Sequence, residues 1–457
     1  MPQTFPWDIQ SPDSVPVTED EIKLIQTTFG VDMSDFLGEI IDTEIILHQK
    51  TTSTFPIRLY EELSGLPRQI FEFIQSSSMI KQPMLALPAA LCAAGAIQGH
   101  RIRSELDTRT NLYCLGLAPS GAGKDHARRA ITKMFWQSGQ QKMVIGDPKS
   151  GSGLKRGIKD NKGRALLMWD EIGRALKQIG SWKAGTHEKN ILEVMMKIFT
   201  SSSTYMPPDS LANRDNKAPT EGIEQPCFCM YGTSVPENFY DSMSGQDVVD
   251  GFLARILAFE STDYVITRRQ KIPVLETPKD LVEEVQRWES MSNNIANGGN
   301  VDMGINPLTV VATPNARKKL DDYDYDSRSR GFNTVYAPLW MRAAEHAEKL
   351  ALIVSNGDTI IEKNAQFGID LAQYCINYME HTIKDRVSSS DTETQLKRIK
   401  RWLEKKGSVI YHRDFTRAFQ DMPGKTRNDL INTLLDSGII ENDSESGKRK
   451  FRVIRED

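Results

Sequence analysis

The sequence predicts an α/β fold built around a largely parallel sheet, and three features of the chain support this. Between about residues 110 and 262, short apolar runs alternate with segments of helical periodicity, as in parallel sheets with crossover helices. A glycine-rich turn joins the first of these runs to a helix, and the pattern after about residue 275 is mostly helical. The runs expected as strands are Leu112 to Leu117, Ala165 to Trp169, Phe228 to Tyr231 and Ile256 to Phe259.

Residues 1–105 are expected to form an N-terminal helical region. Its first part is turn-rich and acidic, with one helix opened by Thr18, where Glu21 stands at capping-box spacing. Further on, apolar residues recur at helical spacing, and Leu85 to Ile97 predicts an alanine-rich helix that packs beside the sheet.

The rest of the chain is expected to form four segments. The α/β core spans 106–262, and a helical lid follows at 263–386, interrupted by one short β-like run, Leu308 to Ala312. A polar, serine-rich stretch at 387–394 is typical of a linker. It leads into a compact unit at 395–457.

Composition excludes several classes of protein. The 457 residues carry a net charge of −4, so any affinity for nucleic acid must come from local basic patches. No run of about 18 apolar residues and no signal-peptide pattern occurs, so we expect a cytoplasmic protein that does not enter membranes. The five cysteines are scattered, which indicates reduced core residues. Cys227 and Cys229 lack a second ligand pair, which favours packing of a buried strand over metal binding.

The glycine-rich turn is predicted to bind the phosphates of ATP. It follows an apolar strand and leads into a helix, so its backbone N–H groups can wrap a phosphate, with glycine where φ must be positive. The ammonium of Lys124 would lie between the β- and γ-phosphates. The residues expected to bind the nucleotide are Pro119, Ser120, Gly121, Ala122, Gly123, Lys124, Asp125 and His126.

Two positions depart from the usual pattern of this loop. Ala118 stands where the first glycine is usual, and Asp125 replaces the hydroxyl that usually ligates Mg²⁺. Asp125 could bind the metal directly, or it could repel the phosphates and leave a weak site. The alternative to a nucleotide loop is a turn that only caps a helix.

A second motif, two acids after an apolar strand, lies about 45 residues further on. Asp170 at the carboxyl end of this strand can hold Mg²⁺ through water, and Glu171 can polarise the attacking water as a general base. A plain strand end is the alternative, but the distance behind the loop favours the catalytic interpretation.

The order of these and later motifs resembles a known family. From Leu66 to about Ser355, two thirds of the chain, the sequence is similar to the phage and plasmid primase-helicase-associated ATPases, long described only as a domain of unknown function. The resemblance implies an AAA+ P-loop core. Besides the loop, it rests on the segments Asp147 to Leu154, Trp169 to Gly173, Asp250 to Ile256 and Arg342 to Ala351.

The resemblance also implies further catalytic residues. The segments around Arg255 and Arg342 are similar to the arginine-finger and sensor-2 segments of minichromosome-maintenance and superfamily-three helicases, so both arginines would reach a nucleotide. Arg255 would act on a neighbouring subunit's ATP, which implies a homo-oligomeric, hexameric ring. The alternatives are a surface arginine for Arg255 and an ordinary ion-pair partner for Arg342.

A third strand ends in hydroxyl residues where AAA+ proteins place the sensor-1 residue. Thr233 is the first candidate for this residue and Ser234 the second. The alternative is a plain turn at the end of a strand.

The C-terminal unit has the pattern of a winged helix. Three helices, Gln395 to Lys406, Arg413 to Phe419 and Lys425 to Ser437, precede a hairpin whose strands flank Asn442 to Gly447. Such units bind DNA or other proteins. The basic residues expected to meet DNA phosphates are Lys425, Arg427, Lys448, Arg449 and Lys450.

A polar loop from Thr204 to Glu224 is a second candidate for DNA contact. Ring helicases extend a loop from this position into the channel, where Arg214 and Lys217 could touch the DNA backbone. The alternative is a surface insertion.

These features together predict a replicative DNA helicase that hydrolyses ATP with Mg²⁺ on single-stranded or forked DNA. The alternative is a non-unwinding factor that uses ATP as a switch, in origin recognition or helicase loading. Nothing in the chain resembles a primase centre, so any primase would be a separate chain.

Overall fold

The structure is a computed structural model of the chain that describes residues 55–179, 186–208, 222–240, 242, 251–261, 275–291, 305–334, 336–386, 391–404, 406, 409–420, 422–443 and 450–454. Several expectations from the sequence lie outside these residues: the helix opened by Thr18, the loop residues Arg214 and Lys217, and the wing residues Lys448 and Arg449.

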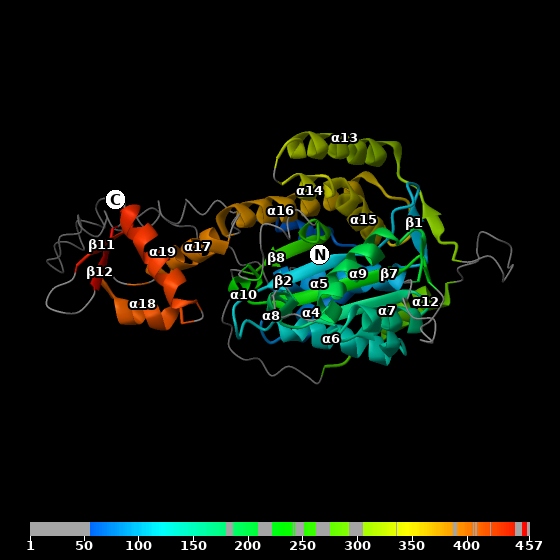
Figure 1. Cartoon of the computed structure of the whole chain (residues 1–457). Coiled ribbons are helices and arrows are strands. Elements are labelled where there is room, and N and C mark those ends of the chain that lie inside the picture. The colour runs from blue at the N-terminus through cyan, green and yellow to red at the C-terminus, as the bar shows by residue number, and fades with distance from the viewer. Residues whose placement is uncertain are drawn as a thin grey trace, which may run out of the picture. The chain divides into compact units, whose positions relative to one another are not determined.

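A five-stranded parallel sheet forms the centre of the molecule, in the order β3-β4-β7-β2-β8 (Figure 1). Its strands are β2 Tyr113–Leu117, β3 Val144–Ile145, β4 Arg164–Trp169, β7 Cys227–Ser234 and β8 Ile256–Glu260. The four strands expected from the sequence are confirmed. Strand β3 was not expected, because two half-buried residues are too short to give a pattern.

Helices cover both faces of this sheet. Helices α5 (Pro83–Gln98) and α6 (Asp125–Gln137) contact each other on one face, and α7 (Gly151–Asp160) and α9 (Thr186–Thr200) contact each other on the other. This follows from right-handed crossovers between parallel strands. Strands covered on both sides are apolar along their whole length, as the fully buried β2 and β7 are.

Helix α5 is the most buried helix of this core. Every residue from Leu85 to Gln98 is buried, as expected for a helix that is apolar all round. Its small side chains let it lie close to its neighbours: a Cβ at Gly95 would stand 2.4 Å from the Thr110 carbonyl oxygen. Helix α4 (Gly65–Ser77) packs on α5, so the two helices expected beside the sheet are confirmed.

Shorter elements complete this part of the chain. They include two strand pairs outside the main sheet, β1 with β9 in parallel and β5 with β6 antiparallel. Their bounds are α3 Arg58–Glu62, β1 Ile102–Ser104, η1 Gln141–Met143, α8 Ile172–Ile179, β5 Tyr205–Met206, β6 Ile223–Glu224, α10 Pro236–Tyr240, η2 Leu253–Arg255, α12 Lys279–Ser290 and β9 Leu308–Val310.

In its described residues, the region expected as a helical lid contains α12 and four further helices, α13 to α16, and Figure 1 shows these four gathered together. Helices α15 and α16 pack at backbone contact, since a Cβ at Gly368 would stand 2.1 Å from the Ala347 carbonyl oxygen. Helix α15 is buried over most of its length and contacts α4 and α5, so this region shares the core of the sheet. The helices are α13 Pro314–Gly331, α14 Ala337–Trp340, α15 Ala343–Ser355 and α16 Glu362–Arg386.

The C-terminal unit has a hydrophobic core of its own, centred on Phe415, Leu434 and Phe451. Three helices surround an antiparallel sheet in the order β10-β12-β11. The expected helices and hairpin are present, but α17 begins at Asp391, so the second half of the stretch expected as a linker at 387–394 is helical. Strand β10 was not expected. The elements are α17 Asp391–Glu404, β10 Val409–Tyr411, α18 His412–Ala418, α19 Gly424–Asp436, β11 Ile440–Asn442 and β12 Lys450–Val453.

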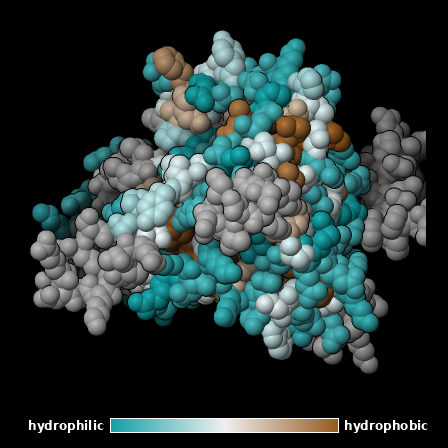
Figure 2. Space-filling view, turned by 90° about the vertical axis from the view of Figure 1, so that its right-hand side faces the viewer, coloured by the Kyte–Doolittle hydropathy of each residue, from teal (hydrophilic) through white to brown (hydrophobic). Residues whose placement is uncertain are grey.

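Polar residues dominate the surface that can be seen in Figure 2, where apolar residues show only in small areas. All five cysteines are free and buried, including Cys227 and Cys229 on β7. In the part of the chain that the structure describes, no helix is both long enough and apolar enough to span a bilayer.

Candidate active site

The glycine-rich turn joins the carboxyl end of β2 to the N-terminus of α6. Gly121 and Gly123 have φ of 81° and 82°, in the region where a side chain would be strained. A Cβ at Gly121 would meet nothing within 4 Å, so the requirement there is conformational. Ala118 is fully buried in a small apolar cluster with Leu85 and Ala122. Its methyl group is therefore packed, which explains why glycine is not needed at that position.

Lys124 is folded back over this loop. Its side chain is 8% exposed, and Nζ donates to the Ala118 carbonyl oxygen at 2.9 Å. Glu171 Oε1 lies 3.8 Å from the same nitrogen. Burial lowers the pKa of Lys124, and the nearby Glu171 carboxylate opposes that shift. The ammonium is thus held at the mouth of the loop by contacts that an anionic ligand could replace.

A buried glutamine that the sequence pattern did not indicate holds the loop from behind. Gln82 precedes α5 and donates through Nε2 to the Ala122 carbonyl oxygen at 2.9 Å, while its Oε1 accepts from Ser261 Oγ. Ser261 follows β8 and donates its backbone N–H to the Leu117 carbonyl oxygen at 2.8 Å. Gln82 therefore ties the loop to the end of the sheet.

The two acids follow β4, and β7 lies between β4 and the strand of the loop. This order brings Thr233, near the end of β7, against the first acid: its hydroxyl donates to Asp170 Oδ1 at 3.1 Å. Ser234 instead donates to the Val235 carbonyl oxygen. Of the two candidate hydroxyls at this strand end, Thr233 is the one directed at the acids.

Glu171 has the unusual backbone conformation often found at functional sites. Its φ is 45°, which is strained for a residue with a side chain. Its Oε2 is buried and has no hydrogen-bond donor among the described residues, and Arg174 Nε lies 4.0 Å from it. The carboxylate therefore retains an unused acceptor that a water molecule could fill.

An arginine that the sequence pattern did not single out joins Asp125 to Asp170. Arg128 Nη2 lies 2.8 Å from Asp125 Oδ1 and 2.7 Å from Asp170 Oδ2. Arg128 stands three residues after Asp125 on α6, a spacing that places two side chains on the same helix face. This spacing was the available signal for the first contact, but the contact with Asp170 depends on the fold.

The oxygens of this cluster fit a magnesium ion with nucleotide phosphates. Mg²⁺ is usually held by one or two carboxylates together with phosphates and water, and Asp125, Asp170 and Thr233 offer oxygens of this kind. Among the described residues, no three or more His, Cys, Asp or Glu side chains are grouped so that they could hold a metal.

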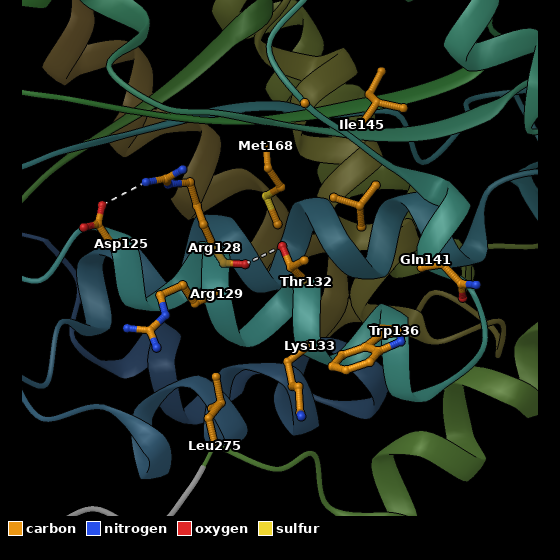
Figure 3. A pocket seen from close by; sticks show the side chains of 12 residues that line it. Asp125, Arg128, Arg129, Thr132, Lys133, Trp136, Gln141, Ile145, Met168 and Leu275 are labelled. Atoms are coloured by element: carbon orange, nitrogen blue, oxygen red, sulfur yellow. Dashed lines mark hydrogen bonds and ion pairs between the residues drawn. The ribbon is translucent and has the colours of Figure 1, made fainter.

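Two hollows adjoin these residues. A pocket of about 250 Å³ lies beside Asp170 and Glu171 and is also lined by Lys149 and by Ile191 of α9. A groove of about 1080 Å³ runs along α6, and Figure 3 shows Asp125 and Arg128 pointing toward one another at one end of it. The site thus opens on both sides of the bridged carboxylates.

The segment before α7 has a structural role at the first pocket. Ser150 caps α7 by accepting the Gly153 backbone N–H at 3.0 Å. A Cβ at Gly151 would stand 2.9 Å from the Asn190 carbonyl oxygen, so glycine lets α7 lie against α9. Lys149, just before this helix, lines the pocket beside the acids.

The remaining residues expected at the nucleotide site lie around the loop. Pro119 is partly exposed and Ser120 is exposed. His126 is held against α4, with its Nε2 3.0 Å from Ser77 Oγ, and burial lowers its pKa.

Arg255 and Arg342 lie together, at the opposite edge of the sheet from the loop. Arg255 directly precedes β8, which pairs in parallel with the five-residue β2, whereas the loop follows the carboxyl end of β2. The two ends of these strands are about 16 Å apart at about 3.3 Å per residue. Both guanidinium groups lie over the ring of Phe199, at 5.8 and 5.7 Å from its centroid. Neither arginine therefore faces the loop of its own chain.

Other contacts fix this pair of arginines. Arg255 Nη1 donates to the Gly251 carbonyl oxygen at 2.7 Å, and Arg342 Nη1 donates to Glu345 Oε2 at 2.6 Å. Burial, followed by the positive charge of Arg342, lowers the pKa of Arg255. Phe199, at the end of α9, had no sequence signal, because its role depends on three distant segments meeting.

The basic residues expected at DNA differ in their surroundings. Lys425 is exposed near the start of α19. Arg427 donates to the carbonyl oxygens of Phe419 and Met422, at 3.1 and 3.0 Å, so part of its guanidinium holds the turn before α19. Lys450 is half-buried, with its Nζ 5.8 Å from the centre of the Tyr411 ring.

The sequence matches no protein-family model and no curated protein.

Proposed function

We propose that this chain is a magnesium-dependent ATPase of the AAA+ type that works in the cytoplasm as an oligomeric ring on DNA. The observation that carries the ATPase proposal is the meeting of Lys124, Asp170, Glu171 and Thr233 at the carboxyl ends of three adjacent strands. These groups come from segments that are far apart in the sequence. A purely structural turn would not require an ammonium, two acids and a hydroxyl at one point.

Each group has a task in phosphoryl transfer. Lys124 would leave the Ala118 carbonyl oxygen and bind the phosphates, and the free Oε2 of Glu171 would accept a proton from the attacking water. Thr233 orients Asp170. Mg²⁺ held by Asp125, Asp170 and the phosphates would offset the charge that develops during transfer.

The position of the two arginines supports a ring. Arg255 and Arg342 lie at the amino ends of the strands, away from their own loop, so a nucleotide that they reach would be one bound by a second copy of the chain. In such a contact, the surface that carries the loop in one subunit meets the surface that carries the arginines in the next. This is a heterologous interface, and it forms a closed ring when the rotation from one subunit to the next divides a full turn evenly. The resemblance to hexameric helicases favours six subunits.

DNA is the partner proposed from the C-terminal unit. Three helices followed by a hairpin give the order of a winged helix, and the exposed Lys425 lies at the start of its third helix. Lysines in such a place bind phosphates without regard to base sequence. Together with the resemblance, this favours a replicative helicase of a phage, plasmid or mobile element, and any primase that works with it would be a separate chain.

Two assays test this proposal. We expect ATP hydrolysis that single-stranded DNA stimulates, and separation of a forked duplex that requires ATP and Glu171. A chain that binds DNA in an ATP-dependent way but never separates the fork would instead be the ATP-switched origin or loading factor. Lack of both ATP binding and hydrolysis would disprove the ATPase itself.

A further inference from the structure

The bridge between Asp125 and Asp170 places a cation of the protein where a metal is expected. One nitrogen, Arg128 Nη2, lies within 2.8 Å of an oxygen from each carboxylate. A magnesium ion binds such oxygens directly at about 2.0 to 2.1 Å, so the guanidinium and the metal require the same acceptors. The two cations therefore exclude each other unless the arginine moves.

The surroundings of Arg128 allow that movement. The side chain is 19% exposed and is one of those that line the groove of about 1080 Å³ along α6 (Figure 3), so it is not enclosed by the protein on every side. Its Nε is buried and has no acceptor among the described residues. A buried donor without a partner is costly, so a nearby phosphate oxygen would stabilise a new position of this group.

We propose that Arg128 competes with the divalent cation for Asp125 and Asp170, so that the metal enters the site with a nucleotide rather than alone. This rests on the proposed nucleotide function. In the nucleotide-free protein Arg128 neutralises the two carboxylates. When nucleotide phosphates arrive, they attract the guanidinium and release the carboxylates to the metal. Arg128 thus offsets the negative charge that Asp125, the unusual aspartate of the loop, adds to the site before nucleotide binds.

The test is a titration of the full-length chain with Mn²⁺ in the absence of nucleotide, followed by electron paramagnetic resonance of the free ion. Arg128→Gln keeps the length of the side chain and removes its charge. It should raise Mn²⁺ affinity by about tenfold or more, because it removes a positive charge that repels the metal and occupies its carboxylate ligands. Arg129→Ala, on the next residue of the same groove, should leave the affinity unchanged.

Two further variants assign the effect. Adding Asp125→Asn to Arg128→Gln should abolish the gained affinity, and Arg128→Lys, which keeps a charge, should stay close to the wild type. Circular dichroism verifies that each variant is folded. A folded Arg128→Gln protein that binds Mn²⁺ no better than the wild type would overturn the proposal, as would a gain that survives Asp125→Asn.

These outcomes are separate from those of the ATPase proposal, because the titration contains no nucleotide. If the wild type fails to bind ATP while Arg128→Gln gains Mn²⁺ affinity, the nucleotide function is wrong and the competition stands. If ATP is hydrolysed but Mn²⁺ affinity does not change, only the competition is wrong.

Discussion

At the scale of single residues, the first prediction concerns Lys124, the lysine of the loop. Lys124→Ala should abolish ATP hydrolysis, because the lysine of the loop is the group expected to bind the β- and γ-phosphates. The free energy of unfolding should change by only about 1 kcal/mol, since the lysine makes a single hydrogen bond to the loop. Phosphate release and thermal unfolding measure the two effects. Turnover at the wild-type rate would remove Lys124 from the site.

Glu171→Gln should separate binding from chemistry. The amide keeps the shape of the side chain and loses the base, so ATP should bind as before while hydrolysis slows by about 10² to 10⁴. A fluorescent ATP analogue measures binding, and single-turnover hydrolysis measures the chemical step. Arg174→Ala is the control, because Arg174 Nε lies 4.0 Å from Glu171 Oε2 and an arginine does not take the proton. If Glu171→Gln fails to bind the analogue, Glu171 is structural.

The site residues that directly follow strands could be predicted from local sequence patterns. The site residues that act through tertiary contacts could not. Lys124, Asp170 and Glu171 stand at fixed places in a strand-turn-helix or strand-end pattern, which a sequence displays directly. Arg128 and Phe199 act through contacts with segments far away in the chain. No spacing reveals such contacts.

At the scale of whole elements, the turn between α4 and α5 should control how well the loop binds phosphate. Gln82→Ala removes the donor to the Ala122 carbonyl oxygen and leaves that oxygen and Ser261 Oγ without a partner. We expect a loss of about 1 to 3 kcal/mol in the free energy of unfolding and weaker ATP binding.

Gln98→Ala is the matched control for that change. Gln98 is also a buried glutamine of this region, but its Nε2 donates to the Ile353 carbonyl oxygen, at the other end of α5. It should destabilise the protein by a similar amount without affecting the affinity for ATP. If the two variants lower ATP affinity equally, Gln82 has no special role in the loop.

Strands with a continuous apolar sequence could be predicted, whereas very short strands could not. The strands β2, β4, β7 and β8 are buried on both faces and therefore continuous in apolar sequence. Strands β3 and β10 have two and three residues and are partly exposed, so neighbouring strands rather than their own sequence determine them.

At the scale of the whole molecule, Arg255 should act between subunits. Arg255→Ala should bind ATP normally and hydrolyse it about 10³ to 10⁵ times more slowly, the contribution of arginine fingers in related chemistry. Mixing it with Lys124→Ala should restore part of the turnover, because some interfaces then pair an intact loop with an intact arginine.

Two affinity tags, one on each variant, verify that mixed oligomers form. Arg330→Ala removes an exposed arginine of α13 and should hydrolyse ATP like the wild type, so that the loss seen with Arg255→Ala is specific to that position. If mixed oligomers form and remain inactive, the action of Arg255 between subunits is wrong.

The burial of α5 also has a consequence for how the chain reaches its fold during synthesis. This helix has no polar face, yet the last strand that covers it, β8, ends roughly 160 residues further along. At about 5 to 20 residues per second, the ribosome needs on the order of 10 to 30 s to supply that cover. During this interval the apolar surface of α5 is exposed to solvent. The nascent chain therefore depends on chaperone protection, and fragments that end before β7 should aggregate.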